Sequence, residues 1–181
     1  MSKPTDLLAN FVTSIKFEDL PEIAVRYTVD AITDCVGVAL VGSMEPLAQH
    51  LLSIISDKKG TAGSAYLFGS RQRAGWTEAA LYNGSLAHAI DYDDTSHPAL
   101  GHPSCHLVPV LFSLGEYSKA NGRALITAYV VGLEVLGTLG RALNPSHYTR
   151  GWHATGTFGA LAAAAAGAKL LNLDVHKVKM A

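Results

Sequence analysis

Apolar residues recur at helical spacing along nearly the whole chain, and this periodicity limits the possible folds more than any other feature. Repeats of the i, i+3, i+4 type are typical of amphipathic helices that bury one face. They predict helices over residues 5–15, 21–42, 46–57, 81–92, 104–120, 124–143 and 156–171. Residues 64–68 are too short for a helix and form the one predicted strand. The sequence therefore predicts an all-α fold, mainly a helical bundle.

Small residues mark two of these helices as closely packed. Helix 124–143 contains Gly132, Gly137 and Gly140, although a glycine inside a helix costs about 1 kcal/mol relative to alanine. Close contact with another helix is the expected compensation. Helix 156–171 is rich in Ala and Gly and is expected to be a central helix that packs on several sides.

The last residues predict one more element. Asp174 is a good N-cap, and residues 175–181 begin a helix that is only a couple of turns long. Isolated helices of that length are marginal in water. We therefore expect residues 1–181 to form one incomplete N-terminal helical domain of a longer protein.

Composition narrows the class of protein. With 181 residues, 49% of them hydrophobic, the chain can form a sizeable core, and its net charge of −1 gives no electrostatic footprint for nucleic acid or an anionic membrane. Cys35 and Cys105 match no zinc or redox spacing and are expected to be reduced core thiols. The N-terminus lacks the apolar region of a secretion signal. We expect a cytoplasmic protein with no nucleic-acid or membrane partner.

Residues 83–106 form the best site candidate. They contain three aspartates and four of the eight histidines, while residues 74–118 contain no Lys or Arg, so histidines and helix dipoles are the carboxylates' nearby sequence partners. Pro98 prevents helix 81–92 from running far past Thr95, which places the acids in its last turn. There the helix macrodipole disfavours each negative charge by roughly 0.3–1 kcal/mol. Such local conflicts often mark functional sites. The residues concerned are Asp91, Asp93, Asp94, His88, His97, His102 and His106.

The positions of these residues within 83–106 indicate different roles for them. Asp91 follows an apolar residue and is expected to be partly buried on a helix face shared with Asp94, where it could act as a general acid or base. Asp93 and Asp94 could equally be a solvated helix end. His97 and His102 flank a proline and a glycine in a loop, where positioned catalytic groups are often found. The remaining two histidines, His88 and His106, are expected to be hydrogen-bonded structural residues.

A second polar segment precedes helix 156–171. His153 lies there, and Thr155, Gly156 and Thr157 would expose backbone amides at a helix N-terminus, which is a natural cradle for a carboxylate or phosphate. Two further residues, His147 and Arg150, could add positive charge.

Metal-dependent hydrolysis at the Asp/His stretch is an alternative, since imidazole and carboxylate suit Zn, Fe or Mn. No His-x-x-x-His or Glu-x-x-His pair on one helix face supports it. The sequence also lacks a glycine-rich phosphate loop, a dinucleotide fingerprint and a Gly-x-Ser-x-Gly elbow.

Two motifs carry a family resemblance. AHAIDYDDTSHPALGHPSCHLVPV, with Asn83 and Gly84 before it, and GWHATGTFGALAAAAAGAKLLNLD resemble the MmgE/PrpD family. The resemblance extends to the early segment PEIAVRYTVDAITDCVGVALVG. It implies a large helical domain with a smaller α+β lid, usually in a homodimer, and a site between the domains. That site acts on small polycarboxylic acids by proton transfer next to a carboxylate, without metal or organic cofactor.

The resemblance also assigns residues. It implies Asp91, His102 and His153 as catalytic groups, although HPALGH is one residue longer than in some members, so His97 competes with His102. A lysine and a tyrosine of the family's lid have no counterpart here, so the 181 residues alone are expected to be inactive. Four residues are expected to bind substrate: His97, Asp94, Thr95 and Thr155.

The implied reaction is that of a lyase, first a dehydratase acting on a small di- or tricarboxylate such as 2-methylcitrate. The same family includes cis-aconitate decarboxylase and iminodisuccinate epimerase, because one proton transfer can start all three reactions. An alternative from another class is a truncated, non-catalytic helical module that dimerises or binds partners.

Overall fold

The computed structural model describes residues 3–56 and 64–181, and it confirms the all-α prediction. Short β1 and β2 pair antiparallel, with Ala65 opposite Ala74. The elements are α1 (Pro4–Ser14), a 3-10 turn (Phe17–Asp19), α2 (Glu22–Gly42), α3 (Pro46–Ser56), β1 (Ala65–Tyr66), β2 (Arg73–Ala74), α4 (Trp76–Ala87), α5 (Ser104–Ser118), α6 (Gly122–Leu143), α7 (Ser146–Thr149), α8 (Ala154–Leu170) and α9 (Val175–Met180).

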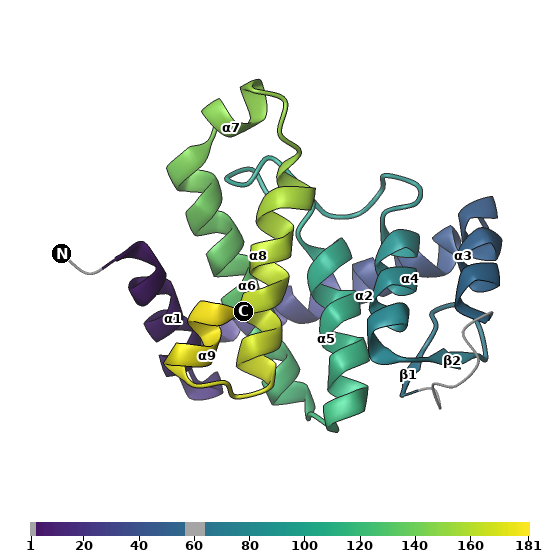
Figure 1. Ribbon diagram of the computed structural model, residues 1–181, viewed down its shortest axis with the longest axis horizontal. Helices are drawn as coiled ribbons and strands as arrows, with labels where there is room; N and C mark the ends of the chain where they lie inside the picture. Colours follow the sequence, from purple (N-terminus) through teal and green to yellow (C-terminus); the bar gives the residue numbers. More distant parts are fainter. Residues whose placement is uncertain (1–2, 57–63) are drawn as a thin grey trace.

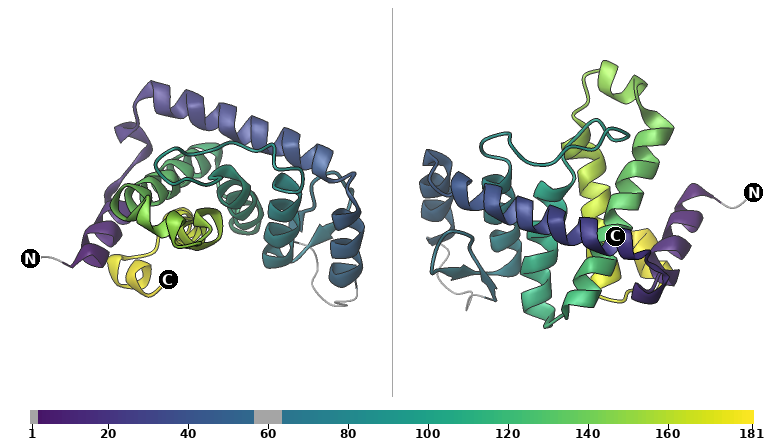
Figure 2. Two further views of the ribbon diagram at one scale, coloured as in Figure 1. Left: turned by 90° about the horizontal axis from the view of Figure 1, so that it is seen from above. Right: turned by 180° about the vertical axis from the view of Figure 1, so that it is seen from behind.

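Four helices, α4, α5, α8 and α6, stand side by side, and long α2 crosses their flank (Figures 1 and 2). The two-stranded sheet and α3 lie beyond α4, while α1 and α9 pack together at the opposite end. The segment between α4 and α5 crosses one end of this helical row, toward α7 and the start of α8. Buried side chains of several helices form the core: Leu86, Leu107, Leu111, Tyr129, Leu136, Phe158 and Ala162.

The predicted close contacts of α6 are confirmed at Gly132. A Cβ there would lie 2.5 Å from Leu107 Cδ2 and 2.9 Å from Ala166 Cβ, so α5 and α8 both approach the α6 backbone. Gly140 instead faces the backbone of Pro98 and Ala99, and a Cβ at Gly137 would meet only the side chain of Arg141 in the same helix. The small residues of α8 explain its central position, as predicted, because they let it contact α5 and α6 together.

Several predicted boundaries were wrong. The helix expected over 81–92 begins at Trp76 and ends at Ala87. The helix expected over 104–120 ends at Ser118. The Asn121 side chain accepts a hydrogen bond from the Ala124 N–H and caps α6. The strand expected over 64–68 is shorter, and its partner β2 was not predicted. The prediction of Asp174 as an N-cap is confirmed, whereas the expected end of the third helix at Asp57 lies outside the described residues.

One described helix, α6, is long and apolar enough by length and composition to cross a membrane, and α2 with α3 meets the same test only as a pair bent by 89°. The core helix of a globular domain passes this test too. In α6, 44% of the relevant window is buried within the protein. Its composition is therefore weak evidence for a membrane span.

Gly132→Ala should destabilise the fold by about 1–3 kcal/mol, because the added methyl group overpacks the contact between α5, α6 and α8. Gly37→Ala is the matched control, since a Cβ at this position inside α2 meets no atom within 4 Å. The free energy of unfolding of this control should rise by about 0.5–1 kcal/mol, because alanine has a higher helix propensity than glycine. Urea unfolding of the three proteins measures both effects. Equal stabilisation by the two substitutions would contradict the close packing at Gly132.

Candidate functional site

The segment between α4 and α5 is irregular but closely fixed. His88 is the C-cap of α4. Asp91 adopts a left-handed backbone conformation with φ of 52°, which Asp tolerates better than most residues. A single antiparallel bridge joins Ser96 to Gly101 around the turn that contains Pro98. The three aspartates thus lie beyond the helix. The predicted helical face shared by Asp91 and Asp94 was wrong, because α4 ends before either residue.

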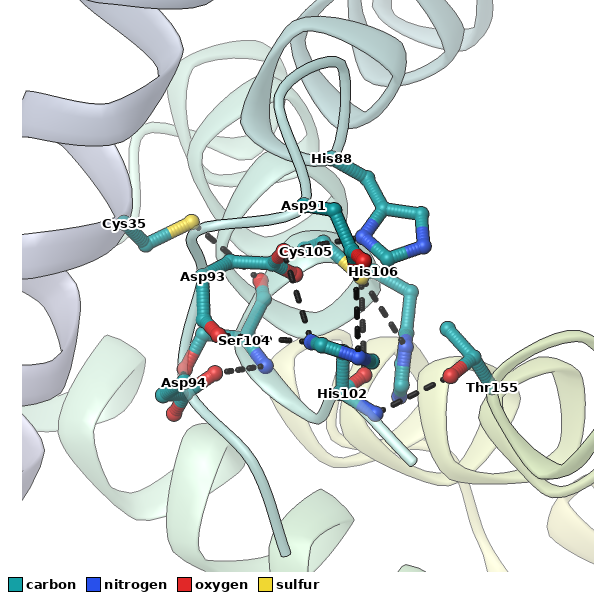
Figure 3. A network of polar contacts seen from close by, with 10 residues as sticks. All are labelled: Cys35, His88, Asp91, Asp93, Asp94, His102, Ser104, Cys105, His106 and Thr155. Atoms are coloured by element: carbon teal, nitrogen blue, oxygen red, sulfur yellow. Dashed lines mark hydrogen bonds and ion pairs between the residues drawn. The ribbon is translucent and has the colours of Figure 1, made fainter. Parts of the chain in front are cut away.

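The centre of the site is the carboxylate of Asp93, whose side chain is fully buried. Asp93 Oδ1 lies 2.8 Å from His88 Nδ1 and 3.4 Å from His102 Nδ1 (Figure 3). The second oxygen, Oδ2, is buried and has no hydrogen-bond partner within the part of the chain that the structure describes. Asp93 therefore orients two imidazole rings, since its backbone carbonyl oxygen also lies 3.3 Å from His102 Nδ1. The ring centroids are 4.8 Å apart.

His102 connects this buried pair to the surface. Its Nε2 lies 3.6 Å from Asp91 Oδ1, and its backbone N–H donates to Thr155 Oγ1 at 3.0 Å. Gly101 lets the loop approach α8 this closely, since a Cβ there would lie 2.9 Å from the same hydroxyl oxygen. The Asp91 side chain is 81% exposed, so the expectation of partial burial was wrong.

Asp94 has a structural partner rather than a free carboxylate. Its Oδ1 accepts from the Ser104 N–H at 3.0 Å, and its Oδ2 accepts from Ser104 Oγ at 2.6 Å. Ser104 Oγ also lies 2.7 Å from the Tyr129 hydroxyl. Burial raises the pKa of Asp94, while the two hydrogen bonds from Ser104 act in the opposite direction. Asp94, expected to bind substrate, therefore anchors the loop at the N-terminus of α5, where a carboxylate is favourable.

A pocket of about 540 Å³ opens beside His102. Three other predicted site residues line it, namely Thr95, His97 and His153, whereas Asp91, Asp94 and Thr155 do not. Tyr148, which belongs to α7, was not predicted, and the alternative of a solvated Asp93 was wrong because its side chain is buried. His88 is hydrogen-bonded, as expected. The polar, aromatic sequence around His153 was a usable signal for Tyr148, but no local pattern indicated the burial of Asp93. The full lining is Thr95, Ser96, His97, Leu100, Gly101, His102, Tyr148 and His153.

The predicted cradle at the start of α8 is largely occupied. The N–H groups of Gly156 and Thr157 both donate to the His153 carbonyl at 3.1 Å. Thr157 Oγ1 lies 3.0 Å from His147 Nε2, and the His147 ring packs on Phe158 with centroids 4.2 Å apart. His147 thus has a structural contact and does not line the pocket. Arg150 is exposed and does not line it either.

Four side chains come close enough to hold a metal ion, although their sequence spacing gave no such signal. One ligand atom from each of His88, Asp91, Asp93 and His102 lies within 4.8 Å of the others. The contributing residues come from a helix end and an irregular loop, so no helical i, i+4 pair was needed.

Buried groups behind the site are held in uncharged form. Burial lowers the pKa of His106 from its ordinary value of 6.5 to about 4, and His106 Nε2 has no hydrogen-bond partner within the described residues. The hydrogen bond expected of His106 is made by its other ring nitrogen, Nδ1, which lies 4.0 Å from Cys105 Sγ. Cys35 and Cys105 are buried and free, as predicted, and burial raises the pKa of both thiols.

A family model and several curated proteins match this chain. Residues 6–181 match the family model of the MmgE/PrpD N-terminal domain. A cis-aconitate decarboxylase-like protein of Aspergillus oryzae is 33% identical over 92% of this chain and 36% of its own length. The cis-aconitate decarboxylases of Mus musculus and Homo sapiens are 31% identical over 98% of this chain and over 37% and 38% of their own lengths. The chain thus spans little more than a third of the curated relatives it matches.

Acid should destabilise the folded chain through His106. Between its ordinary pKa of 6.5 and its folded pKa of about 4, the unfolded state binds a proton that the folded state does not. The free energy of unfolding should therefore be highest above pH 6.5. It should fall by on the order of 3 kcal/mol as the pH drops toward 4.

Urea unfolding across this pH window tests the effect. His106→Asn should flatten the dependence of stability on pH, whereas His176→Asn, at an exposed position of α9, should retain the wild-type dependence. Parallel curves for wild type and His106→Asn would contradict the assignment.

Proposed function

The chain belongs to the MmgE/PrpD family, and from this membership we propose that it forms the N-terminal part of a lyase site for small polycarboxylic acids. One observation carries the proposal. His102 lies in the pocket wall with the buried Asp93 behind one ring nitrogen and the exposed Asp91 near the other. This is the arrangement of a proton-transferring group held by an orienting carboxylate.

The reaction needs a proton carrier near the substrate carbon. A proton next to a carboxylate is weakly acidic, so its removal or return requires a positioned acid–base group. His102 suits this role because Asp93 and Thr155 fix its ring and its backbone. Asp91, 3.6 Å from His102 Nε2, faces solvent and is free to take or give a proton beside it.

Histidines and hydroxyl groups provide the substrate contacts. His97 and His153 line the pocket with Thr95, and a protonated imidazole binds a carboxylate well. No Lys or Arg of the described residues lines this pocket. A polycarboxylate carries more negative charge than these groups balance, so we propose that further cationic side chains come from the part of the protein beyond these 181 residues. That part would correspond to the family's lid.

Decarboxylation of a cis-aconitate-like tricarboxylate is the reaction we propose first. Relatives that are 31–33% identical to this chain over the aligned residues are named as cis-aconitate decarboxylases or as similar to one. In that reaction the bond to one carboxylate breaks, CO₂ leaves, and the electron pair left on carbon takes up a proton from the acid–base group. Dehydration of 2-methylcitrate is the second candidate, because the same groups can remove a proton before hydroxide leaves as water.

We also propose a cytoplasmic homodimer without nucleic-acid or membrane partners. The support is the near-neutral net charge of −1 and the dimers implied by the family resemblance. Light scattering on a size-exclusion column would give the oligomeric state, and a monomer at micromolar concentration would contradict the dimer.

Asp91→Asn and His102→Gln should each reduce turnover at least about 100-fold, the usual contribution of a general acid–base group. The assay measures CO₂ release from cis-aconitate and water loss from 2-methylcitrate, together with the intact mass of the preparation. A preparation of 19.1 kDa should show no turnover, whereas a longer protein containing this chain should be active.

Asp30→Asn removes an exposed acid of α2 and serves as the control that should keep turnover. Full activity of both Asp91→Asn and His102→Gln would refute the assignment. Turnover of 2-methylcitrate alone would select dehydration over decarboxylation.

A further inference from the structure

We propose that His88, Asp91, Asp93 and His102 bind one divalent transition-metal ion of the zinc class, and that this ion inhibits the enzyme. The binding claim concerns only the described side chains, whereas the inhibition rests on the proposed lyase function. Three features support it: the spacing of the ligands, a buried carboxylate with one oxygen that lacks a hydrogen-bond partner, and the number of protein ligands.

The spacing of the four side chains is close to that of a tetrahedral site. Zinc bonds to imidazole nitrogen and carboxylate oxygen are about 2.0–2.2 Å, which places neighbouring ligand atoms roughly 3.3–3.6 Å apart. In the site, Asp93 Oδ1 lies 2.8 Å from His88 Nδ1, and Asp91 Oδ1 lies 3.6 Å from His102 Nε2. Nε2 is the His102 nitrogen that remains for an ion, because Nδ1 lies 3.3 Å from the Asp93 carbonyl oxygen. With one atom from each residue, all four lie within 4.8 Å of one another. Small side-chain rotations therefore suffice to enclose an ion.

The charge of the cluster favours a cation. Asp93 is 5% exposed, and its buried Oδ2 has no hydrogen-bond partner among residues 3–56 and 64–181. Its carboxylate faces the two imidazole rings, as Figure 3 shows. A buried carboxylate is costly unless it is paired, and residues 74–118 contain no Lys or Arg. A divalent ion would balance Asp93 and Asp91 together.

The ligands are held in place before any ion binds. Thr155 fixes the backbone of His102, and the end of α4 fixes His88. Next to Asp93, Asp94 is anchored by two hydrogen bonds from Ser104. Only Asp91 is exposed and free to move onto the ion. Such supporting contacts usually strengthen metal binding because little order is lost when the ion arrives.

The ligand count indicates inhibition rather than catalysis. Catalytic zinc sites typically use three protein ligands and leave one position for water or substrate, whereas four protein ligands close the site. Here the ion would also occupy Asp91 and His102, the groups we assign to proton transfer. A bound ion would therefore block turnover.

Titration of the 181-residue chain with Co²⁺ and Zn²⁺ tests the binding. We expect one equivalent of Co²⁺ to give the visible absorption of a tetrahedral site, and Zn²⁺ to displace it. His88→Gln and Asp93→Asn should each weaken binding at least 10-fold, while His176→Gln, at an exposed position of α9, should not. Circular dichroism checks that each variant is folded. If Asp93→Asn does not fold, His88→Gln decides, since the His88 side chain is 33% exposed.

Absence of saturable binding, or equal binding by wild type and a folded His88→Gln variant, would overturn the proposal. The inhibition is tested separately on the enzyme that turns over substrate, with free Zn²⁺ held by a metal buffer because tricarboxylates chelate zinc. Turnover should fall with site occupancy and return after addition of a chelator. Acceleration by the ion, or no effect at full occupancy, would overturn inhibition. Loss of the proposed function would instead appear as no turnover in metal-free enzyme, with binding unchanged.

Discussion

Burial of the Asp93 carboxylate determines much of the geometry around it. A carboxylate removed from water costs several kcal/mol unless hydrogen bonds or opposite charge replace its hydration. Its partners are His88, five residues earlier at the end of α4, and His102, nine residues later just before α5. The intervening chain must fold back so that both rings reach one oxygen. An irregular loop with a left-handed residue, Asp91, is the result.

The helical row then fixes this loop from several sides. Ser104 at the start of α5 holds Asp94, and Thr155 at the start of α8 holds His102. At the end of α6, the Asn144 side-chain amide donates to the carbonyl oxygens of Pro98 and Ala99 at 3.1 and 2.7 Å. Three helices with separate positions in the sequence thus support one segment. A loop supported in this way can place side chains as accurately as a regular element does.

Periodicity predicted the helices well because each buries one face against the core. The same reasoning failed between α4 and α5, because apolar residues do not recur there at a helical spacing. Pro98 set only an outer limit for α4, and the helix stops at Ala87, without a glycine to mark its end. The loop around His97 and His102 and the GWH motif with His153, both singled out from the sequence, line one pocket in the structure. The burial of Asp93 was not predictable from local pattern, because acids are mostly exposed and its partners are distant along the chain.

The two ligands proposed for this site require opposite proton states of His102, the imidazole that both would use. As the group that gives a proton to the substrate carbon, His102 must carry that proton while the polycarboxylate is bound. A metal ion requires a lone pair and therefore a neutral ring. Asp93 serves both states, because it pairs with an imidazolium in one and balances the ion in the other. Competition between substrate and metal thus follows from chemistry as well as from space, and it depends on a buried carboxylate outside the lining of the pocket.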